Sequence, residues 1–381
     1  MTTQFSSNLC IGLFDNLMDD NINSHSVKAE YFSFFDQPES TTETLKVCAN
    51  GLATQVPINI TTPFCYDPAP FVLLEALITG SSNQQPNISF SSNSVEKVIQ
   101  SLRLPKLMSC CEVSDKEDVW PFPIKYGRAY KRNYDSEIID NEIYKAVMGY
   151  VETLDSWLGA HGFSMKSQFK VQMEDQLFEL LGNADHAYNG NCTDDGGDWA
   201  ICGFMVARNN EKTKEKEHIC HISVITLGQT IQETLENPPN EFVAERIKAY
   251  ANHAETHTLL SREALVTAVA THDDISCAEI GGGNGLTDFL STFPNVAASL
   301  DKERNAVVIS GCGHVRFKDK YASLIETARN SQRQPFNDYF STDFPPDTNY
   351  VYHNDNRISG TVIGVRFNLD EENLAKKANG S

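Results

Sequence analysis

The sequence lacks any apolar run close to the roughly 20 residues that a membrane-spanning helix needs. Its longest apolar stretches, such as residues 71–78, are far shorter and include a glutamate. The opening residues, MTTQFSSNLCIGLFDN, also lack the basic segment and the long apolar core of a secretory signal. We therefore expect a cytoplasmic protein that has no membrane partner.

Basic residues are scarce as well. The chain has 31 Lys and Arg against 51 Asp and Glu, which gives a formal net charge of −20. A surface of this sign repels nucleic acid, so no nucleic-acid partner is expected and any phosphate site must be local. The ten cysteines contain no C-x-x-C pair, and adjacent Cys110 and Cys111 suit a tetrahedral zinc site poorly. In the cytoplasm we expect them as reduced thiols.

What is present is the composition of a folded protein. The 381 residues are 40% hydrophobic and 22% charged, close to globular averages. At roughly 100–200 residues per domain, this length favours two domains. No internal repeat is found.

The first part of the chain alternates strand-like and helix-like patterns. Residues 45–61, rich in Val, Ile and Thr, predict a strand, and residues 68–80, opened by proline and closed by glycine, predict a helix. A short strand at 88–90 and a helix at 95–104 follow. These elements predict a small N-terminal α/β domain over residues 1–115, which faintly resembles STAS-type domains.

A charged stretch with two prolines then favours a linker over residues 116–135. Beyond it, residues 136–157 and 164–188 have the pattern of two long helices. Residues 199–208 and 218–227 predict antiparallel neighbouring strands, because the charged segment between them suits a hairpin loop.

A helical region follows to about residue 270, and later strands are predicted at 305–311, 314–317 and 360–369. The fold class is therefore α/β. Residues 136–381 are expected to form a two-layer α/β sandwich, in which helices cover one face of a mixed, mainly antiparallel sheet.

The helix predicted at 164–188 carries the first candidate catalytic and metal-binding residues. Helical spacing predicts one buried apolar stripe, which consists of Leu177, Leu181, Ala184 and Tyr188. A separate polar face consists of Gln176, Glu179, Asn183 and His186. Glu179 and Asn183 lie one turn apart. An amide oxygen can bind Mg²⁺ while a carboxylate orients or deprotonates a water, although an ordinary exposed face would also account for this pair.

A glycine-rich segment provides a second candidate site. It consists of Gly281, Gly282, Gly283, Asn284, Gly285 and Leu286. Such a loop before a helix lets the backbone approach a ligand and directs amide donors at phosphate. A flexible surface loop with no ligand would have the same sequence pattern.

Taken in order, these segments resemble the histidine-kinase-like (GHKL) ATPase superfamily over residues 140–370. The segment ELLGNADHA is similar to its N-box, which would make Glu179 the general base and Asn183 a Mg²⁺ ligand. The segment GGGNGL is similar to the phosphate-facing hinge of its ATP lid. The last strand, GTVIGVRFNL, is similar to the one whose threonine, here Thr361, belongs to the adenine-side water network.

One segment departs from the family's pattern. Where the family has D-x-G-x-G, whose aspartate accepts a hydrogen bond from adenine, this chain has Thr226, then Gly228, then Thr230. Threonine can still accept one hydrogen bond, but it carries no charge. The resemblance implies ATP and Mg²⁺ as cofactors.

Three functions stay open at this stage. The first is a regulatory signalling protein in which Mg-ATP orders a lid and controls a protein partner or a second copy, with slow ATP hydrolysis or kinase activity as further options. The second is a pseudo-ATPase scaffold that binds no nucleotide. The third is an S-adenosylmethionine-dependent methyltransferase, because CAEIGGGNG also resembles E-x-G-x-G-x-G with Asp301 as a ribose acceptor about 20 residues beyond Glu279.

Overall fold

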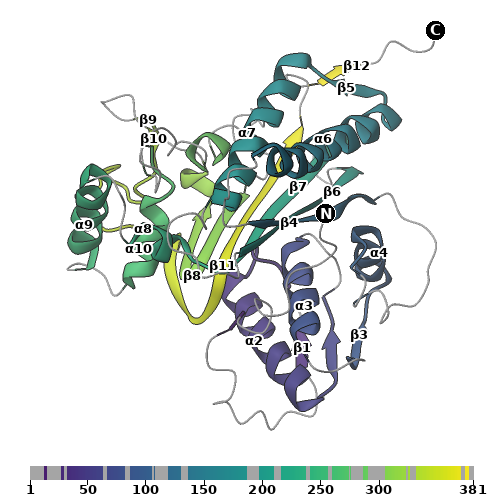
Figure 1. Cartoon of the computed structure of the whole chain (residues 1–381), viewed down its shortest axis with the longest axis horizontal. Helices are drawn as coiled ribbons and strands as arrows, with labels where there is room; N and C mark the ends of the chain where they lie inside the picture. Colours follow the sequence, from purple (N-terminus) through teal and green to yellow (C-terminus); the bar gives the residue numbers. More distant parts are fainter. Residues whose placement is uncertain are drawn as a thin grey trace.

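The fold is seen in a computed structural model of the chain. It describes residues 13–14, 27–29, 32–62, 67–81, 86–104, 107, 119–129, 136–186, 197–209, 216–236, 241–255, 260–273, 275, 286–290, 305–322, 325–326, 332–369 and 374–376. A long twisted sheet runs through the middle of the molecule, with helices on one side and the N-terminal unit on the other (Figure 1).

The central sheet has five strands in the order β4-β6-β7-β11-β8, and all four neighbouring pairs are antiparallel. The strands are β4 (Val119–Ala129), β6 (Gly197–Asn209), β7 (Lys216–Leu227), β8 (Asn305–Phe317) and β11 (Val351–Leu369). The predicted antiparallel pairing of the strands at 199–208 and 218–227 is therefore confirmed. The separate strands predicted at 305–311 and 314–317 are one strand, β8.

Helices cover one face of this sheet. They are α6 (Ser136–Ala160), α7 (Ser167–His186), α8 (Ile231–Leu235), α9 (Glu241–Glu255) and α10 (Arg262–Val269). Their apolar side chains form one cluster with alternate sheet residues such as Ile201, Val224 and Val308. The two long helices predicted at 136–157 and 164–188 are confirmed as α6 and α7.

Smaller elements complete this half of the molecule. Strand β5 (Phe163–Met165) pairs with β12 (Leu374–Lys376), and β9 (Ile325–Glu326) pairs with β10 (Gln332–Arg333). A short 3-10 helix, η1 (Asp319–Tyr321), follows β8.

The N-terminal unit has its own small sheet, with parallel strands in the order β1-β2-β3. Its elements are β1 (Val27–Ala29), α2 (Pro38–Thr54), β2 (Ile58–Ile60), α3 (Ala69–Gly80), β3 (Ile88–Phe90) and α4 (Asn93–Leu102). The predicted strand at 88–90 and the two helices on either side of it are confirmed. The resemblance to STAS-type domains remains a prediction.

The prediction of a strand over residues 45–61 is wrong for most of that range. Residues up to Thr54 belong to helix α2, and only Ile58–Ile60 form a strand. Buried Leu45, Cys48 and Leu52 recur at helical spacing, and Pro38 opens the helix. The β-branched content of the run masked this period.

The second face of the central sheet packs on the N-terminal unit. One apolar cluster joins α2, α3 and α4 to sheet residues such as Ile225 and Val362. At Gly364 the contact is close, since a Cβ there would lie 2.9 Å from Phe35 Cζ. The mixed α/β fold class, with an antiparallel sheet covered by helices, is confirmed, and the N-terminal unit adds a third layer.

The stretch interpreted as a linker contains a strand of the sheet. Its described part, Val119–Ala129, is β4, which among the described strands pairs with β6 alone and so forms an edge of the sheet. Pro121 and Pro123 are tolerated there, because an edge strand has one side whose N–H groups need no strand partner. The division into domains at 1–115, 116–135 and 136–381 otherwise stays a prediction. Among the described helices, none combines the length and apolar character needed to cross a membrane.

Candidate functional site

Helix α7 separates its apolar and polar faces as its sequence predicts. Leu177, Leu181 and Ala184 are buried in the core beneath the helix. Glu179 and Asn183 are exposed, one turn apart. The helix therefore holds a carboxylate and an amide side by side at the surface while its apolar stripe anchors them to the sheet.

One more side chain on this face has an unusual environment. Gln176 lies one turn before Glu179, and its side-chain Oε1 is buried with no hydrogen-bond partner among the described residues. A buried carbonyl oxygen without a donor is costly, so it commonly marks a place where water or a ligand donates.

The glycine cluster itself, Gly281, Gly282, Gly283, Asn284 and Gly285, lies outside the described residues. The described chain resumes at Leu286, in a short helical segment at 286–290. This segment is well anchored, because Phe289 and Leu290 are buried in the core and the Thr287 hydroxyl donates to the Thr271 carbonyl at 3.2 Å. The chain from Leu286 to Leu290 is therefore held against the helical layer.

Asp288 connects this segment to α7. Burial raises the pKa of the Asp288 carboxyl, and the negative charges of Asp273 and Glu179 raise it further. Glu179 must therefore lie close enough to Asp288 to affect its titration. The carboxylates of Glu179 on α7 and of Asp288 therefore lie within electrostatic range of each other.

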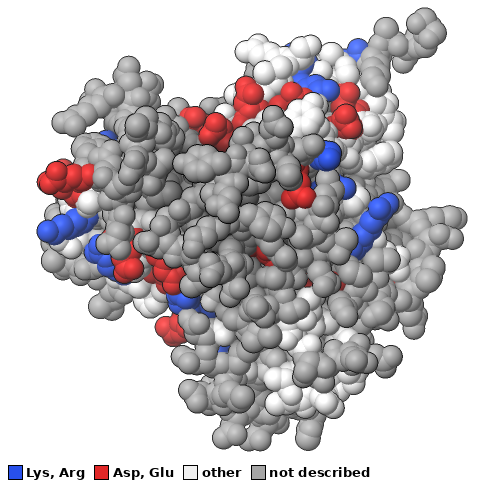
Figure 2. Space-filling model, in the orientation of Figure 1, with Lys and Arg blue, Asp and Glu red and all other residues white. Residues whose placement is uncertain are grey.

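The surroundings of Glu179 are acidic. Glu152, Asp175 and Glu179 are exposed on α6 and α7, and carboxylates are prominent over these two helices in Figure 2. Such a surface attracts divalent cations and repels free nucleotide phosphates. A phosphate ligand therefore needs a bound cation here, which neutralises part of its negative charge.

The two threonines expected on the adenine side are brought together by strand pairing. Thr226 on β7 lies opposite Thr361 on β11, and Trp199 on β6 lies opposite Thr226 on its other side. The Thr226 hydroxyl donates to the Thr361 carbonyl at 3.3 Å. This donation uses the hydroxyl hydrogen, so the Thr226 oxygen retains its capacity to accept.

A third hydroxyl, which the sequence did not reveal, extends this network. Ser310 Oγ lies 2.8 Å from Thr361 Oγ1 and accepts the backbone N–H of Ile231 at 2.7 Å. Ser310 comes from β8, which pairs with β11, and only the strand register places it beside Thr361. Thr226, Thr361 and Ser310 are all nearly buried.

The turn after β7 is shaped by glycine. Gly228 has φ +127° and donates its N–H to the Ser359 carbonyl at 3.3 Å. Gly360 has φ +136°, and a Cβ there would lie 2.0 Å from the Thr226 carbonyl oxygen. Thr230 then caps α8, accepting from the Glu233 N–H while the Glu233 carboxylate accepts the Thr230 N–H. Thr230 thus has a structural role at the position where the family has its second glycine.

The described residues fit Mg-ATP only if the nucleotide helps to hold the metal. Among them, no group of three or more His, Cys, Asp or Glu could bind a metal ion. Asn183 and Glu179 offer the oxygen donors that Mg²⁺ prefers, and phosphate oxygens and water would complete its shell. The free thiols of Cys48, Cys202 and Cys220 are buried in the core, so a ligand at the surface does not contact them.

Comparisons with known proteins give no further identification. No family model matches the chain, and no curated protein or solved structure matches it.

Proposed function

We propose that the chain is a regulatory ATP-binding protein of the histidine-kinase-like ATPase type, in which Mg-ATP orders a lid and so changes the surface shown to a protein partner. The observation that carries this proposal is the influence of Glu179 on Asp288. Glu179 belongs to the N-box-like segment and Asp288 follows the glycine-rich segment, and the two carboxylates lie within electrostatic range of each other.

In this proposal each segment has a distinct task. Asn183 would bind Mg²⁺ through its side-chain oxygen, and residues 281–286 would direct backbone N–H groups at the phosphates. Thr226 would accept a hydrogen bond from the base, and Thr361 would hold the water network beside it. Mg²⁺ neutralises phosphate charge when bound. The acidic surroundings of α7 favour Mg-ATP over free ATP.

Hydrolysis would fall to Glu179. Its carboxylate is exposed beside Asn183, where a water could lie between it and a bound phosphate. A carboxylate in that position would orient the water and take its proton. Without a base of this kind the protein would hold ATP as a switch instead of consuming it.

A second candidate function is a pseudo-ATPase scaffold. The Thr226, Thr361 and Ser310 hydroxyls form a nearly buried network that needs no ligand. If these side chains fill the space where adenine would bind, the protein is a packed module that acts only through its surface contacts with partners. The methyltransferase alternative is not proposed, because it requires a doubly wound parallel sheet and the central sheet is antiparallel.

The test compares single variants of α7 for binding and for turnover. We expect Asn183→Ala to lose Mg²⁺-dependent ATP binding. Glu179→Gln should bind ATP as the wild type does while losing most hydrolysis. Gln168→Ala, exposed at the other end of the helix, controls for the first variant, and Asp175→Asn, one turn from Glu179, controls for the loss of charge. Equal turnover by wild type and Glu179→Gln would remove the general-base role.

A further inference from the structure

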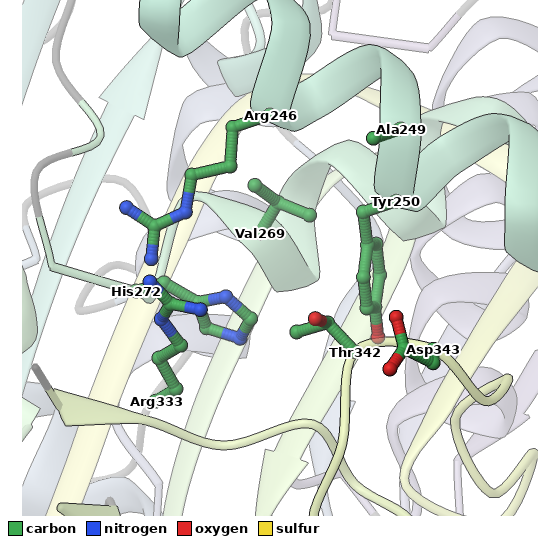
Figure 3. A pocket seen from close by; sticks show the side chains of 8 residues that line it. All are labelled: Arg246, Ala249, Tyr250, Val269, His272, Arg333, Thr342 and Asp343. Atoms are coloured by element: carbon green, nitrogen blue, oxygen red, sulfur yellow. The ribbon is translucent and has the colours of Figure 1, made fainter. Parts of the chain in front are cut away.

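A cavity of about 270 Å³ lies between α9, the end of α10 and the chain around β10 (Figure 3). Its volume is just below the roughly 300–1,000 Å³ typical of sites for drug-sized ligands. None of the residues that line it belongs to the proposed nucleotide site. Its chemistry therefore has to be explained separately.

Two arginines from distant parts of the sequence converge on this cavity. Arg246 comes from α9 and Arg333 from β10, and their guanidinium groups point to the same side, next to the ring of His272 (Figure 3). Arg246 Nη1 donates to the Asp273 carbonyl at 2.8 Å, which fixes the orientation of its guanidinium. Two fixed guanidinium groups at one place favour a planar or tetrahedral oxyanion.

His272 adds to this picture because it stays neutral. It is 1% exposed, and burial together with the charges of Arg246 and Arg333 lowers its pKa to about 3. Its Nε2 lies 3.3 Å from the Gln334 carbonyl, so this nitrogen is the one that carries the hydrogen. The effect of both arginines on one ring shows that their positive charges act on the same small volume.

Tyr250 supplies an independent sign of a ligand. Its side chain lines the cavity and is only 5% exposed, yet its hydroxyl has no hydrogen-bond partner among the described residues. An unpartnered buried hydroxyl costs about 1–3 kcal/mol, which a bound acceptor would recover. In Figure 3 the hydroxyl end of Tyr250 lies on the side of the cavity where Thr342 and Asp343 are.

We propose that this cavity is a binding site for a small molecule with one oxyanion group, phosphoryl or carboxylate, which is held by Arg246 and Arg333, and whose other end contacts the Tyr250 hydroxyl. Asp343 at the rim sets the other requirement. Its carboxylate repels a second anionic group and accepts from a hydroxyl or amine. The ligand therefore carries a hydrogen-bond donor at the end away from its oxyanion.

The experiment titrates the full chain with inorganic phosphate and, separately, with acetate, in the absence of nucleotide. Sodium chloride keeps the ionic strength constant, and binding is measured by calorimetry and by the shift in Tm. We expect saturable binding of at least one oxyanion above the chloride baseline. Tighter binding of phosphate assigns a phosphoryl ligand, and tighter binding of acetate assigns a carboxylate.

Two variants locate the binding. Arg333→Gln should weaken oxyanion binding by roughly tenfold or more, since a hydrogen bond to a charged group is lost. Lys248→Gln removes the same charge from an exposed position on α9 and should bind as the wild type does.

The wild-type titration keeps the test decisive if Arg333→Gln folds poorly. No response of the wild type beyond that of chloride would overturn the proposal, and the cavity would then hold only water. Unchanged oxyanion affinity in a folded Arg333→Gln variant would overturn it as well, because binding would then lie elsewhere.

Discussion

Thr226 and Thr361 lie directly opposite each other on β7 and β11, and the Thr226 hydroxyl donates to the Thr361 carbonyl at 3.3 Å. In the sequence these two residues are 135 positions apart. Their pairing places the two threonines of the proposed adenine side next to each other. This end of the sheet is where base recognition is to be tested.

Changing Thr226 to aspartate should restore preference for ATP over GTP if the adenine side is open. A carboxylate would accept from the adenine amino group, a contact worth about 1.5–3 kcal/mol when charged. Affinity for ATP should therefore rise by roughly tenfold or more while affinity for GTP does not. Titration of both nucleotides with the variant and the wild type measures this.

The same substitution separates the two proposed functions. In a filled pseudo-ATPase core, the new carboxylate would be buried without a partner, and the free energy of unfolding would fall by several kcal/mol with no ATP response. Thr226→Val is the neutral control in both cases. If neither binding nor stability changed, Thr226 would not lie at a base-binding position.

Gly360→Ala should destabilise the fold strongly. The new Cβ would lie 2.0 Å from the Thr226 carbonyl oxygen, and φ at this position is +136°. We expect a loss of about 2–4 kcal/mol in the free energy of unfolding, measured by urea denaturation. Gly182→Ala on α7 is the matched control, since nothing lies within 4 Å of its Cβ, and it should be neutral or stabilising by up to about 1 kcal/mol. Equal losses in both variants would contradict this account of the turn.

Asp288→Asn should make nucleotide binding less dependent on Mg²⁺. Asp273 and Glu179 already raise the pKa of Asp288, so removing this charge lowers the repulsion that free ATP meets. The affinity ratio between Mg-ATP and ATP in EDTA should narrow several-fold. Asp355→Asn, whose carboxylate is almost fully exposed on β11, should leave the ratio unchanged. A ratio unaffected by Asp288→Asn would remove the acidic group from the proposed site.

The protein should lose stability as the pH falls below about 6.5, the usual pKa of histidine. Burial lowers the pKa of both His272 and His314 to about 3. Between these values the unfolded chain binds protons that the folded chain does not, so each residue costs up to about 1.4 kcal/mol per pH unit. Asp67 acts the other way, because burial raises its pKa to about 7 and the folded state keeps its proton longer.

His314→Leu isolates one of these contributions. Both ring nitrogens of His314 are buried without a hydrogen-bond partner among the described residues. The variant should be at least as stable as the wild type at pH 7, and its unfolding free energy should fall less between pH 7 and pH 5. Urea denaturation at both values gives the comparison, and parallel losses in the two proteins would refute the assignment.

The sequence predicts those elements whose period is clean. Helix α7 shows the buried stripe of Leu177 and Leu181, and β7 has apolar residues on both of its faces, such as Val224 and Ile225. This pattern indicates a strand that is covered on both faces, and the N-terminal unit covers the second face. Helix α2 was missed because β-branched residues hid its helical spacing, and β4 because its prolines resembled a linker.

The candidate site was predictable only where one element holds both residues. Glu179 and Asn183 share a helix face, so spacing alone brings them together. Ser310 enters the threonine network through the register of β8 on β11, and Asp288 meets Glu179 through the packing of helices. The arginines of the cavity, Arg246 and Arg333, carry no motif at all. Such pairings depend on tertiary structure that no local pattern encodes.

The most direct test of the proposed function is a calorimetric titration of the wild-type chain with ATP, in Mg²⁺ and again in EDTA. The account predicts saturable binding in Mg²⁺ that weakens at least tenfold in EDTA and disappears in Asn183→Ala. Absence of any heat of binding and of any shift in Tm at millimolar Mg-ATP would contradict it, and the pseudo-ATPase scaffold would then be the better description of the protein.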